Sequence, residues 1–481
     1  MNVEELLQSS EGKTLEFKRD LSSPKNLLKT LVAFANTAGG RVLVGVDDVT
    51  RQLLGMENPL DDEERLCSLI ADSITPRLVP DVEMVTIDGK TLLVVEVFLS
   101  GLRPHWLKSE GPEEGVYVRL GSTNRKADRE LIGELRRSAE GVAFDELPMP
   151  GLSVDDLDLT VMNALFHEQR ELSERELLTL RLLIHEQGHL VPTRGAILLF
   201  GKERLRHFPD AWVQCGRFAG RDKTEIFDHI ELYDPLPQAV ESIMLFLKKH
   251  AMRSAEFSDV RRRDVWSIPL GILREAVINA LVHADYSQRG APVRIAFFDD
   301  RIEIENPGIL LPGMTIDDMR QGISKIRNHV IARLFRELKL IEQWGSGVRR
   351  IFSEAEALGL PVPEITEAGM RMRLVVRLGQ SHSVLSSPDQ VSRLESRLES
   401  RLESRLAARI LLALQQGEAG KAALAAAMGH KSVSGELHKQ IKRLLELALI
   451  EMTIPEKTNS RLQKYRLTAE GKRVVAGVFN A

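Results

Sequence analysis

The spacing of hydrophobic and polar residues changes along the chain and divides it into segments of different periodicity. Residues 15–18 alternate apolar and charged side chains, which is typical of a short strand. An apolar stretch then predicts a helix over residues 27–36, and after a glycine turn a buried strand over 42–46. Short strands mixed with helices, continued through the centre of the chain, predict an α+β fold with several domains.

Three polar residues, Glu275, Asn279 and His283, stand four positions apart in an otherwise apolar segment. On a helix this spacing places them on one face. An amide oxygen can bind Mg²⁺ beside nucleotide phosphates, and a carboxylate one turn earlier can orient an attacking water. The set therefore suits Mg²⁺-nucleotide chemistry. The alternative is an amphipathic helix whose polar stripe only faces solvent.

The residues that follow add strands and glycine turns. Asn306-Pro307-Gly308 breaks an extended segment, and Trp344-Gly345-Ser346-Gly347 precedes an apolar helix. A Gly-x-Gly turn before a helix lets backbone N–H groups approach phosphate. The elements predicted here are strands over residues 292–298 and 301–305 and helices over 326–338 and 348–357.

In this order the motifs resemble the GHKL ATP-binding fold over residues 265–378, most closely its divergent helicase-related branch in bacterial regulators. The resemblance implies ATP and Mg²⁺ as cofactors, Asn279 as a Mg²⁺ ligand and Glu275 as candidate ATPase base. GHKL proteins usually carry Asp in the first glycine box, where it binds the adenine amino group. This chain has Asn306 there, so we expect slow turnover or none. The cofactor-binding residues implied are Asn279, His283, Asp285, Asn306, Gly308, Gly345 and Gly347.

Near the N-terminus, the Leu15-Glu16-Phe17-Lys18 segment and the Ala33-Phe34-Ala35-Asn36-Thr37 segment before Gly39-Gly40 resemble the Schlafen/AlbA-type domain over residues 1–140. Family members bind nucleic acid, and in the animal Schlafens the same core is a metal-dependent RNase. By this resemblance Glu11 and Glu16 are candidate metal ligands. The candidate nuclease acids are Glu11, Glu16, Asp47 and Asp48, which could hold a cation that activates water. The alternative is that Glu16 pairs with Lys18 at the surface and Glu11 caps a helix.

The C-terminal residues predict three short helices, over 407–414, 421–428 and 436–447, and a hairpin of strands over 449–452 and 464–467. This is the order of a winged helix-turn-helix, here over residues 408–481. Residues 393–481 hold sixteen Lys and Arg against nine acids, a balance of +7, whereas the whole chain has −4. A basic module on an acidic chain favours contact with nucleic acid, and protein contact is the alternative.

Basic residues in the two end segments are candidates for phosphate contacts. In the N-terminal segment they accompany the Schlafen/AlbA motifs, and in the C-terminal segment they belong to the third predicted helix. The candidates are Lys18, Arg19, Arg41, Arg119, Arg125, Lys439, Lys442 and Arg443.

Two segments join these domains. Residues 141–264 are expected to be a linking region without a catalytic constellation. In it the patterns predict helices over 159–168, 174–186 and 235–252 and strands over 195–201 and 211–218. Residues 388–407 contain a tandem Ser-Arg-Leu-Glu repeat that predicts a helix, either paired with a partner helix or solvated as a spacer.

Composition limits the function further. The chain has 481 residues, of which 43% are hydrophobic and 28% charged, and only two cysteines. No disulfide framework, zinc site, membrane segment or signal peptide is expected, which favours a cytoplasmic protein. The sequence thus predicts an ATP-binding and nucleic-acid-binding regulator, with DNA favoured over RNA, that forms a homo-oligomer. The rival hypotheses are a metal-dependent nuclease gated by nucleotide, and an assembly scaffold that binds no nucleic acid.

Overall fold

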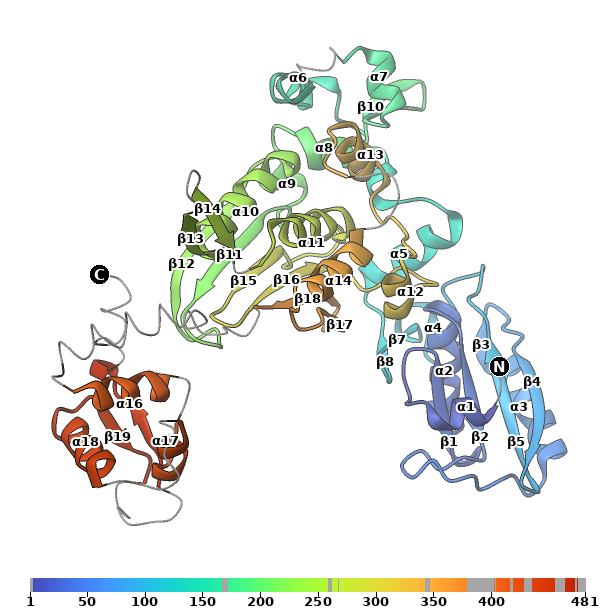
Figure 1. The fold of residues 1–481 in the computed structure, drawn as a ribbon. Helices are drawn as coiled ribbons and strands as arrows, with labels where there is room; N and C mark the ends of the chain where they lie inside the picture. Colours follow the sequence, from blue (N-terminus) through green and yellow to red (C-terminus); the bar gives the residue numbers. More distant parts are fainter. Residues whose placement is uncertain are drawn as a thin grey trace. The chain divides into compact units, whose positions relative to one another are not determined.

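The computed structural model forms two compact units, Met1–Gly379 and Gln380–Ala481 (Figure 1). It describes residues 3–166, 172–257, 262–266, 268–341, 347–378, 402, 404–415, 418–427, 435–454, 463–471 and 474. Helices and strands mix in both units, which confirms the predicted α+β multidomain class. Among the described residues, no helix is both long and apolar enough to span a bilayer.

The N-terminal part of the first unit contains a four-stranded sheet in the order β1-β2-β5-β4. β1 (Leu15–Lys18) runs parallel to β2 (Gly40–Val44), and α2 (Pro24–Asn36) crosses between them, as two parallel neighbours require. The other elements here are α1 (Val3–Gln8), α3 (Pro59–Ser73), β3 (Ile74–Thr75), β4 (Asp81–Ile87), β5 (Lys90–Val97), β6 (Trp106–Leu107), α4 (Gly111–Glu114), β7 (Tyr117–Leu120), β8 (Thr123–Lys126) and α5 (Arg129–Glu140).

The helix α2 holds this part together. Pro24 stands in its first turn, where a missing N–H costs nothing, and its side chains from Leu31 to Asn36 are buried. Buried Asn36 donates from Nδ2 to the carbonyl oxygens of His105 and Tyr117, at 2.9 and 3.0 Å. The predicted strand–helix–strand order is therefore confirmed, with each boundary within a few residues of its expected place.

A six-stranded sheet forms the centre of the first unit, in the order β12-β11-β15-β16-β18-β17. β15 (Val293–Phe297) runs parallel to β11 (Val213–Phe218), and all other neighbours are antiparallel. β15 and β16 (Arg301–Pro307) confirm two predicted strands. β11 and β12 (Ile226–Leu232) come from the region expected to be only a link. The last strands are β17 (Glu364–Ala368) and β18 (Arg371–Arg377).

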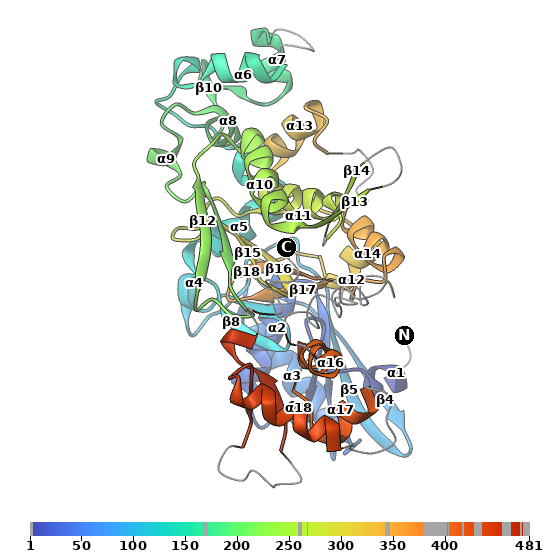
Figure 2. The same cartoon turned by 60° about the vertical axis from the view of Figure 1, so that its left-hand side comes forward.

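Helices α10 (Leu236–Ala251) and α11 (Leu270–His283) lie side by side over one face of this sheet (Figure 2). Their apolar residues join one continuous core that extends from Leu157 to Leu378. The other elements are η1 (Phe144–Glu146), η2 (Val154–Asp156), α6 (Leu159–Phe166), α7 (Glu174–Thr179), β9 (Leu183–Glu186), β10 (His189–Pro192), α8 (Arg194–Phe200), α9 (Arg204–His207), β13 (Met252–Phe257), β14 (Arg262–Trp266), α12 (Ile316–Gln321), α13 (His329–Glu337) and α14 (Gly347–Ala357).

Two predicted elements in residues 141–264 are wrong. The strand expected over 195–201 is the helix α8, which Thr193 caps by accepting the N–H of Ala196 at 3.1 Å. Every residue from Gly195 to Phe200 is buried, so no polar position marks the helical period. The helix expected over 174–186 ends at Thr179, and β9 follows it.

Several contacts join the N-terminal part to the six-stranded sheet. Lys13 Nζ lies 2.7 Å from Glu367 Oε1 on β17, and the N–H of Gly313 donates to the carbonyl of Thr37 at 2.6 Å. Ile309, just after β16, is buried in a cluster that includes Val116 and residues of α5. The two parts therefore share buried surface within one unit.

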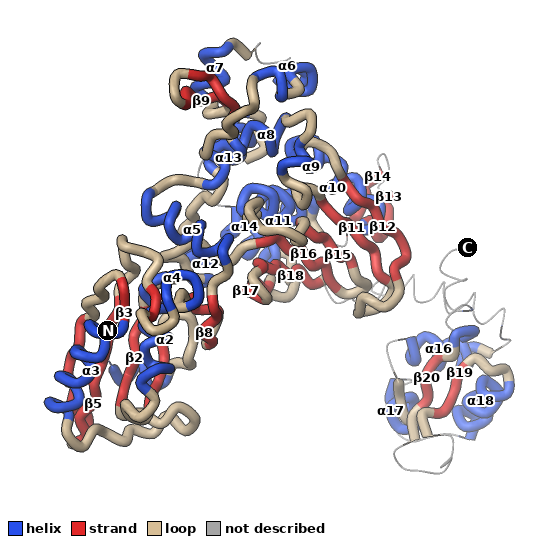
Figure 3. The backbone as a smooth tube through the Cα atoms, turned by 180° about the vertical axis from the view of Figure 1, so that it is seen from behind, coloured by secondary structure: helices blue, strands red, loops and turns tan. Residues whose placement is uncertain are grey.

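The C-terminal unit has its own hydrophobic core. Its described residues form helices and a pair of strands (Figure 3), and β19 pairs with β20 in an antiparallel hairpin. This confirms the predicted order of three helices and a hairpin. The elements are α16 (Arg405–Gln415), α17 (Lys421–Ala427), α18 (Gly435–Glu446), β19 (Ile450–Met452) and β20 (Tyr465–Leu467). The Ser-Arg-Leu-Glu repeats lie almost wholly outside the described residues.

Candidate functional site

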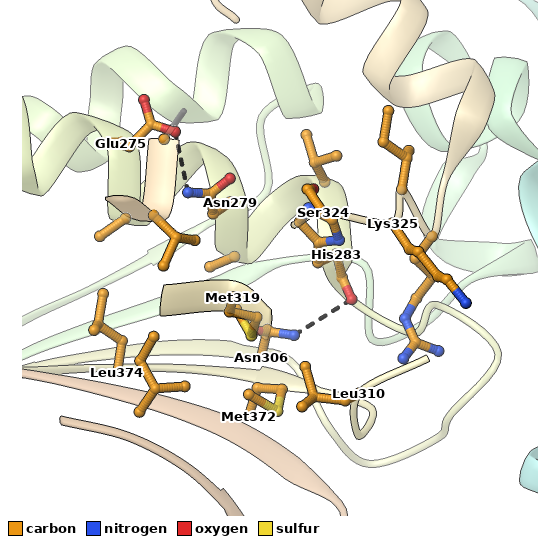
Figure 4. A pocket seen from close by; sticks show the side chains of 18 of the residues that line it. Glu275, Asn279, His283, Asn306, Leu310, Met319, Ser324, Lys325, Met372 and Leu374 are labelled. Carbon is orange, nitrogen blue, oxygen red and sulfur yellow. Dashed lines mark hydrogen bonds between the residues drawn. The ribbon is translucent and has the colours of Figure 1, made fainter. Parts of the chain in front are cut away.

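A cavity of about 470 Å³ lies between α11, the strands β16 and β18, the start of α14 and the segment that follows β16 (Figure 4). Apolar side chains such as Met319, Met372 and Leu374 form much of its wall. A few polar side chains from α11 and β16 face the same space. A largely apolar hollow with few polar groups is typical of a small-molecule site.

The polar stripe of α11 faces this cavity. Glu275, Asn279 and His283 all line it, while Val277 and Leu281 on other sides of the helix are buried in the core. Asn279 donates from Nδ2 to Glu275 Oε1 at 3.1 Å. This bond fixes the amide so that Oδ1 is the atom available to a cation. The three polar residues at four-residue spacing therefore line one wall of the cavity, rather than forming a stripe that only faces solvent.

Asn306 and His283 form the end of the cavity near the C-terminus of α11. Asn306 donates from Nδ2 to the carbonyl of His283 at 3.4 Å (Figure 4), and also to the carbonyl of Pro307 at 3.1 Å. Burial, and then the charge of Arg327, lowers the pKa of His283 to about 4. His283 is consequently neutral at pH 7, so it offers the cavity a hydrogen-bonding group without a charge.

Gly347 begins α14 directly opposite the polar stripe. A Cβ at this position would overlap Glu275 Oε1 and would lie 3.3 Å from Asn279 Nδ2. Any side chain here would therefore occupy the space beside the stripe. Gly345, with Trp344 and Ser346, lies outside the described residues.

Asp285 and Gly308, expected to bind cofactor, lie behind the cavity wall. Asp285 is buried and accepts the Ser287 N–H at 3.1 Å and hydroxyl at 2.5 Å. Gly308 has a φ of +98°, and a Cβ there would meet Asp285 at 2.9 Å and Arg327 at 3.2 Å. The glycine thus permits a close internal approach, which is a packing role, and neither residue lines the cavity.

The cavity wall carries cationic residues that the motifs did not reveal, and three of them, Arg327, Arg350 and Arg373, form ion pairs with Glu134, Glu354 and Glu305. Five cationic residues line it against one carboxylate, Glu275. They come from the segment between the two glycine motifs, from α13 and α14, and from β18, so only the fold brings them together. The five are Lys325, Arg327, Arg336, Arg350 and Arg373.

Three of the four candidate acids of the N-terminal part are occupied by internal contacts, and the fourth, Asp48, is exposed. Glu11 Oε1 accepts the backbone N–H of Phe17 at 2.8 Å. Glu16 is buried and forms ion pairs with Lys18 and with Arg119. Asp47 accepts the N–H of Thr50 at 2.7 Å and its hydroxyl at 2.8 Å, and these two bonds lower its pKa.

These acids do not gather into the expected metal site. Within the part of the chain that the structure describes, no three His, Cys, Asp or Glu side chains are placed to hold a metal ion. Glu11, Glu16, Asp47 and Asp48 all belong to that part. The ion pair between Glu16 and Lys18 in the alternative prediction is present, and Arg119 also pairs with Glu16, but Glu16 is buried rather than at the surface and Glu11 accepts the N–H of Phe17 on β1 instead of capping a helix.

The candidate phosphate contacts divide into buried and exposed residues. Arg119 has a 1% exposed side chain and bonds Gly12, Asn124 and Glu16, so the prediction that it contacts phosphate is wrong. Lys18 and Arg41 are engaged by Glu16 and Glu96. Arg19 and Arg125 are exposed near the N-terminal sheet, and Lys439 and Lys442 are exposed on α18, with Arg443 partly so.

Comparisons with known proteins give three family matches. The family described as "Schlafen, AlbA_2" matches residues 11–128. The family "Putative ATP-dependent DNA helicase recG C-terminal" matches residues 290–376. The family "Filamentation induced by cAMP protein Fic-like, C-terminal domain" matches residues 407–468. The chain therefore contains a Schlafen AlbA_2 domain followed by a domain of the recG C-terminal family, as the motifs indicate.

Two solved structures are similar. The DIP2311 protein from Corynebacterium diphtheriae is 20% identical, with 99% of this chain and 97% of that chain covered and a TM-score of 0.42. The N-terminal domain of a putative ATP-dependent DNA helicase RecG-related protein from Nitrosomonas europaea is 31% identical, with 26% of this chain and 90% of that chain covered and a TM-score of 0.22. No curated protein matches the chain.

Proposed function

We propose that the protein is an ATP-binding, nucleic-acid-binding regulator. The observation that carries the ATP half is the position of Glu275, Asn279 and Gly347 around one wall of a cavity of about 470 Å³. Such an arrangement of an amide, a carboxylate and a glycine suits a Mg²⁺-bound nucleotide. The family match of residues 290–376 supports the same reading. The proposed domains are residues 1–140, 141–264, 265–378, 388–407 and 408–481, with β11 and β12 completing the sheet of the third.

The residues fit Mg²⁺ with a nucleotide. Asn279 Oδ1 would hold Mg²⁺, which keeps waters and phosphate oxygens as its other ligands and neutralises phosphate charge. The missing side chain of Gly347 would let backbone approach the phosphates. Glu275 is the candidate to orient a water, and its bond from Asn279 keeps it beside that place.

The opposite end of the cavity suits a base with an amino group. The two donor hydrogens of Asn306 are directed at the carbonyls of His283 and Pro307, so Oδ1 is the atom that would accept from adenine. A carboxylate could not be held by these two carbonyls, because it has no hydrogen to donate. Asn306 thus replaces the usual Asp without loss of the acceptor. We infer ATP binding with slow turnover or none.

Calorimetry with Mg·ATP tests the ATP half of the proposal. Wild-type protein should bind, and Gly347→Val should bind at least about tenfold more weakly, which is about 1.4 kcal/mol, because the valine fills the space beside Asn279. Gly101→Val is the matched control, since a Cβ at Gly101 meets nothing within 4 Å. A wild type that does not bind ATP would overturn the proposal.

The nucleic-acid half of the proposal is supported by the family match of residues 11–128 and by exposed basic residues on both units. The three helices and hairpin of residues 405–467 are proposed to act as a winged helix, with α18 and its Lys439, Lys442 and Arg443 facing DNA. Because the C-terminal unit has its own core, a chain ending at Gly379 can be compared with the full chain.

That truncation should bind duplex DNA more weakly and show a flatter plot of log K against log salt, because fewer phosphates are neutralised. Fluorescence anisotropy across a series of salt concentrations measures both quantities. An unchanged slope would place the whole DNA contact in the first unit.

A further inference from the structure

Arg327 stands in the wall of the cavity and also contacts the Schlafen AlbA_2 part. Its Nη1 forms an ion pair with Glu134 on α5, and its Nη2 donates to the carbonyl of Ile309. The side chains of Arg327 and Glu134 are only 6% and 9% exposed. The two residues are separated by 193 positions in the sequence, so the bond joins distant segments of the chain.

The charge on Arg327 is kept by its surroundings. Burial opposes the charged form, but the carboxylates of Glu134 and Asp285 raise the pKa of Arg327 overall. Separating the two partners of such a buried pair leaves buried charges without compensation, which is costly. A displacement of Arg327 must therefore move α5 or break the bond.

The residues after Arg327 are tied to the same two places. Asn328 donates from Nδ2 to the carbonyls of Val282 and Ala284, both at 2.7 Å, at the end of the helix that carries the polar stripe. Asp145, in η1 shortly after α5, accepts the N–H groups of Val330 at 2.7 Å and Ile331 at 3.0 Å. The segment 327–331 thus connects the stripe of α11 with the α5–η1 region.

From this juxtaposition we propose that Arg327 couples occupancy of the cavity to the Schlafen AlbA_2 domain, and that Glu134 is the positioning residue that transmits the change. The proposal rests on the proposed ATP and nucleic-acid binding. A nucleotide that contacts the wall shifts the preferred place of Arg327, and Glu134 passes this shift to α5. That helix follows the β7–β8 hairpin, which carries the exposed Arg125. Binding at either site then changes affinity at the other by the same factor.

The test measures this factor in the full chain. A short fluorescein-labelled DNA duplex is titrated with and without a saturating Mg²⁺ complex of a non-hydrolysable ATP analogue. Wild type should show a ratio of affinities on the order of 5–150-fold. In Glu134→Gln, which cannot hold the guanidinium by charge, the ratio should fall to within about twofold of one, although both ligands still bind.

Lys13→Met is the matched control. It removes another ion pair between the same parts, at Glu367, which is not among the residues that line the cavity. This variant should keep the wild-type ratio. If Glu134→Gln does not fold, the double variant Glu134→Leu with Arg327→Met replaces the pair by apolar side chains, a change that buried pairs often tolerate. It should also bring the ratio to about one.

Hydrogen exchange gives a second readout that needs no nucleic acid. The ATP analogue should change amide exchange in residues 129–146 of wild type and of Lys13→Met, but not of Glu134→Gln. Equal ratios in wild type and Glu134→Gln, or equal loss in Lys13→Met, would overturn the inference while leaving the proposed function intact. A wild type that binds no nucleotide would overturn both.

Discussion

Two groups of polar side chains, each built around a glutamate, have opposite surroundings. On α11, Glu275, Asn279 and His283 face a cavity of about 470 Å³. Around β1, Glu16 and Arg119 are buried against each other, and their remaining polar atoms are bonded to Lys18, Gly12 and Asn124. The first group is directed at open space, whereas the second is saturated by the protein itself.

Internal pairing distinguishes a structural polar group from one that can bind a ligand. A buried polar atom must be paired, and pairing within the chain removes the capacity to bind a ligand. Arg119 uses three of its nitrogens and its backbone N–H in this way. In the cavity, Arg327, Arg350 and Arg373 are likewise paired with carboxylates, so the group directed at a ligand there is the polar stripe of α11 rather than these cations.

The largest expected effect is a loss of stability when the buried pair of Glu16 and Arg119 is broken. Glu16→Gln should lower the free energy of unfolding by about 3–5 kcal/mol, because it leaves the buried Arg119 guanidinium without its carboxylate. Denaturant titration measures the loss. A matched exposed change, Glu83→Gln on β4, should have almost no effect.

The same variant tests the nuclease hypothesis. Because three of the four candidate acids are engaged internally, neither wild type nor Glu16→Gln should cleave single-stranded RNA in Mg²⁺ or Mn²⁺. Glu16 would be shown to bind metal if the wild type cleaved RNA and the folded part of the Glu16→Gln preparation did not.

The next largest effect is expected on the affinity of the cavity for Mg·ATP. Asn279→Ala should weaken Mg·ATP binding by about 1.5–3 kcal/mol, because it removes the amide oxygen offered to Mg²⁺ and the donor that holds Glu275. Calorimetry with and without Mg²⁺ separates the two losses. Asn163→Ala, an exposed asparagine on α6, is the control. Equal weakening without Mg²⁺ would mean that Asn279 does not act through the metal.

A smaller effect should follow the protonation of His283, whose pKa burial lowers to about 4. His283 takes up a proton near pH 6.5 in the unfolded chain but only near pH 4 in the folded chain. The free energy of unfolding therefore decreases as the pH falls from about 6.5 to about 4. At pH 5 the loss is at most about 2 kcal/mol relative to pH 7.

His283→Gln should remove this part of the pH dependence, whereas the exposed His189→Gln should keep it. Burial raises the pKa of Asp145 to about 6, so protonation of Asp145 stabilises the fold as the pH falls and opposes the effect of His283. For this reason the pH dependence of the variant is compared with that of the wild type. The measurement is denaturant unfolding at pH 5 and pH 7. Identical pH dependence in His283→Gln and wild type would contradict the assignment to His283.

The sequence predicted those features of the fold and the site that depend on residues close together in the chain, and missed those that depend on distant residues. The stripe of α11 was predictable because four-residue spacing acts within one helix, and the strand–helix–strand order of residues 15–44 for the same reason. Arg327 was not predictable as a cavity residue, since its place depends on Glu134, far away in the chain. The burial of Arg119 likewise comes from tertiary pairing with Glu16. Spacing indicates which side chains share a face, but not whether that face meets a partner.

The smallest effect should appear in the exposed basic residues, and it sharpens the contrast with Arg119. Arg125 lies on β8 of the β7–β8 hairpin, and its side chain is exposed. We therefore expect the stability of the fold not to depend on its charge. Arg125→Ala should leave stability within about 0.5 kcal/mol of wild type and lower the slope of log K against log salt for DNA by about one, the share of one phosphate contact. Arg206→Ala, an exposed arginine on α9, should leave that slope unchanged. If both variants reduce the slope equally, the effect reflects total charge. If neither does, the β7–β8 hairpin does not touch the phosphates, and the contact belongs to other exposed residues such as Arg19.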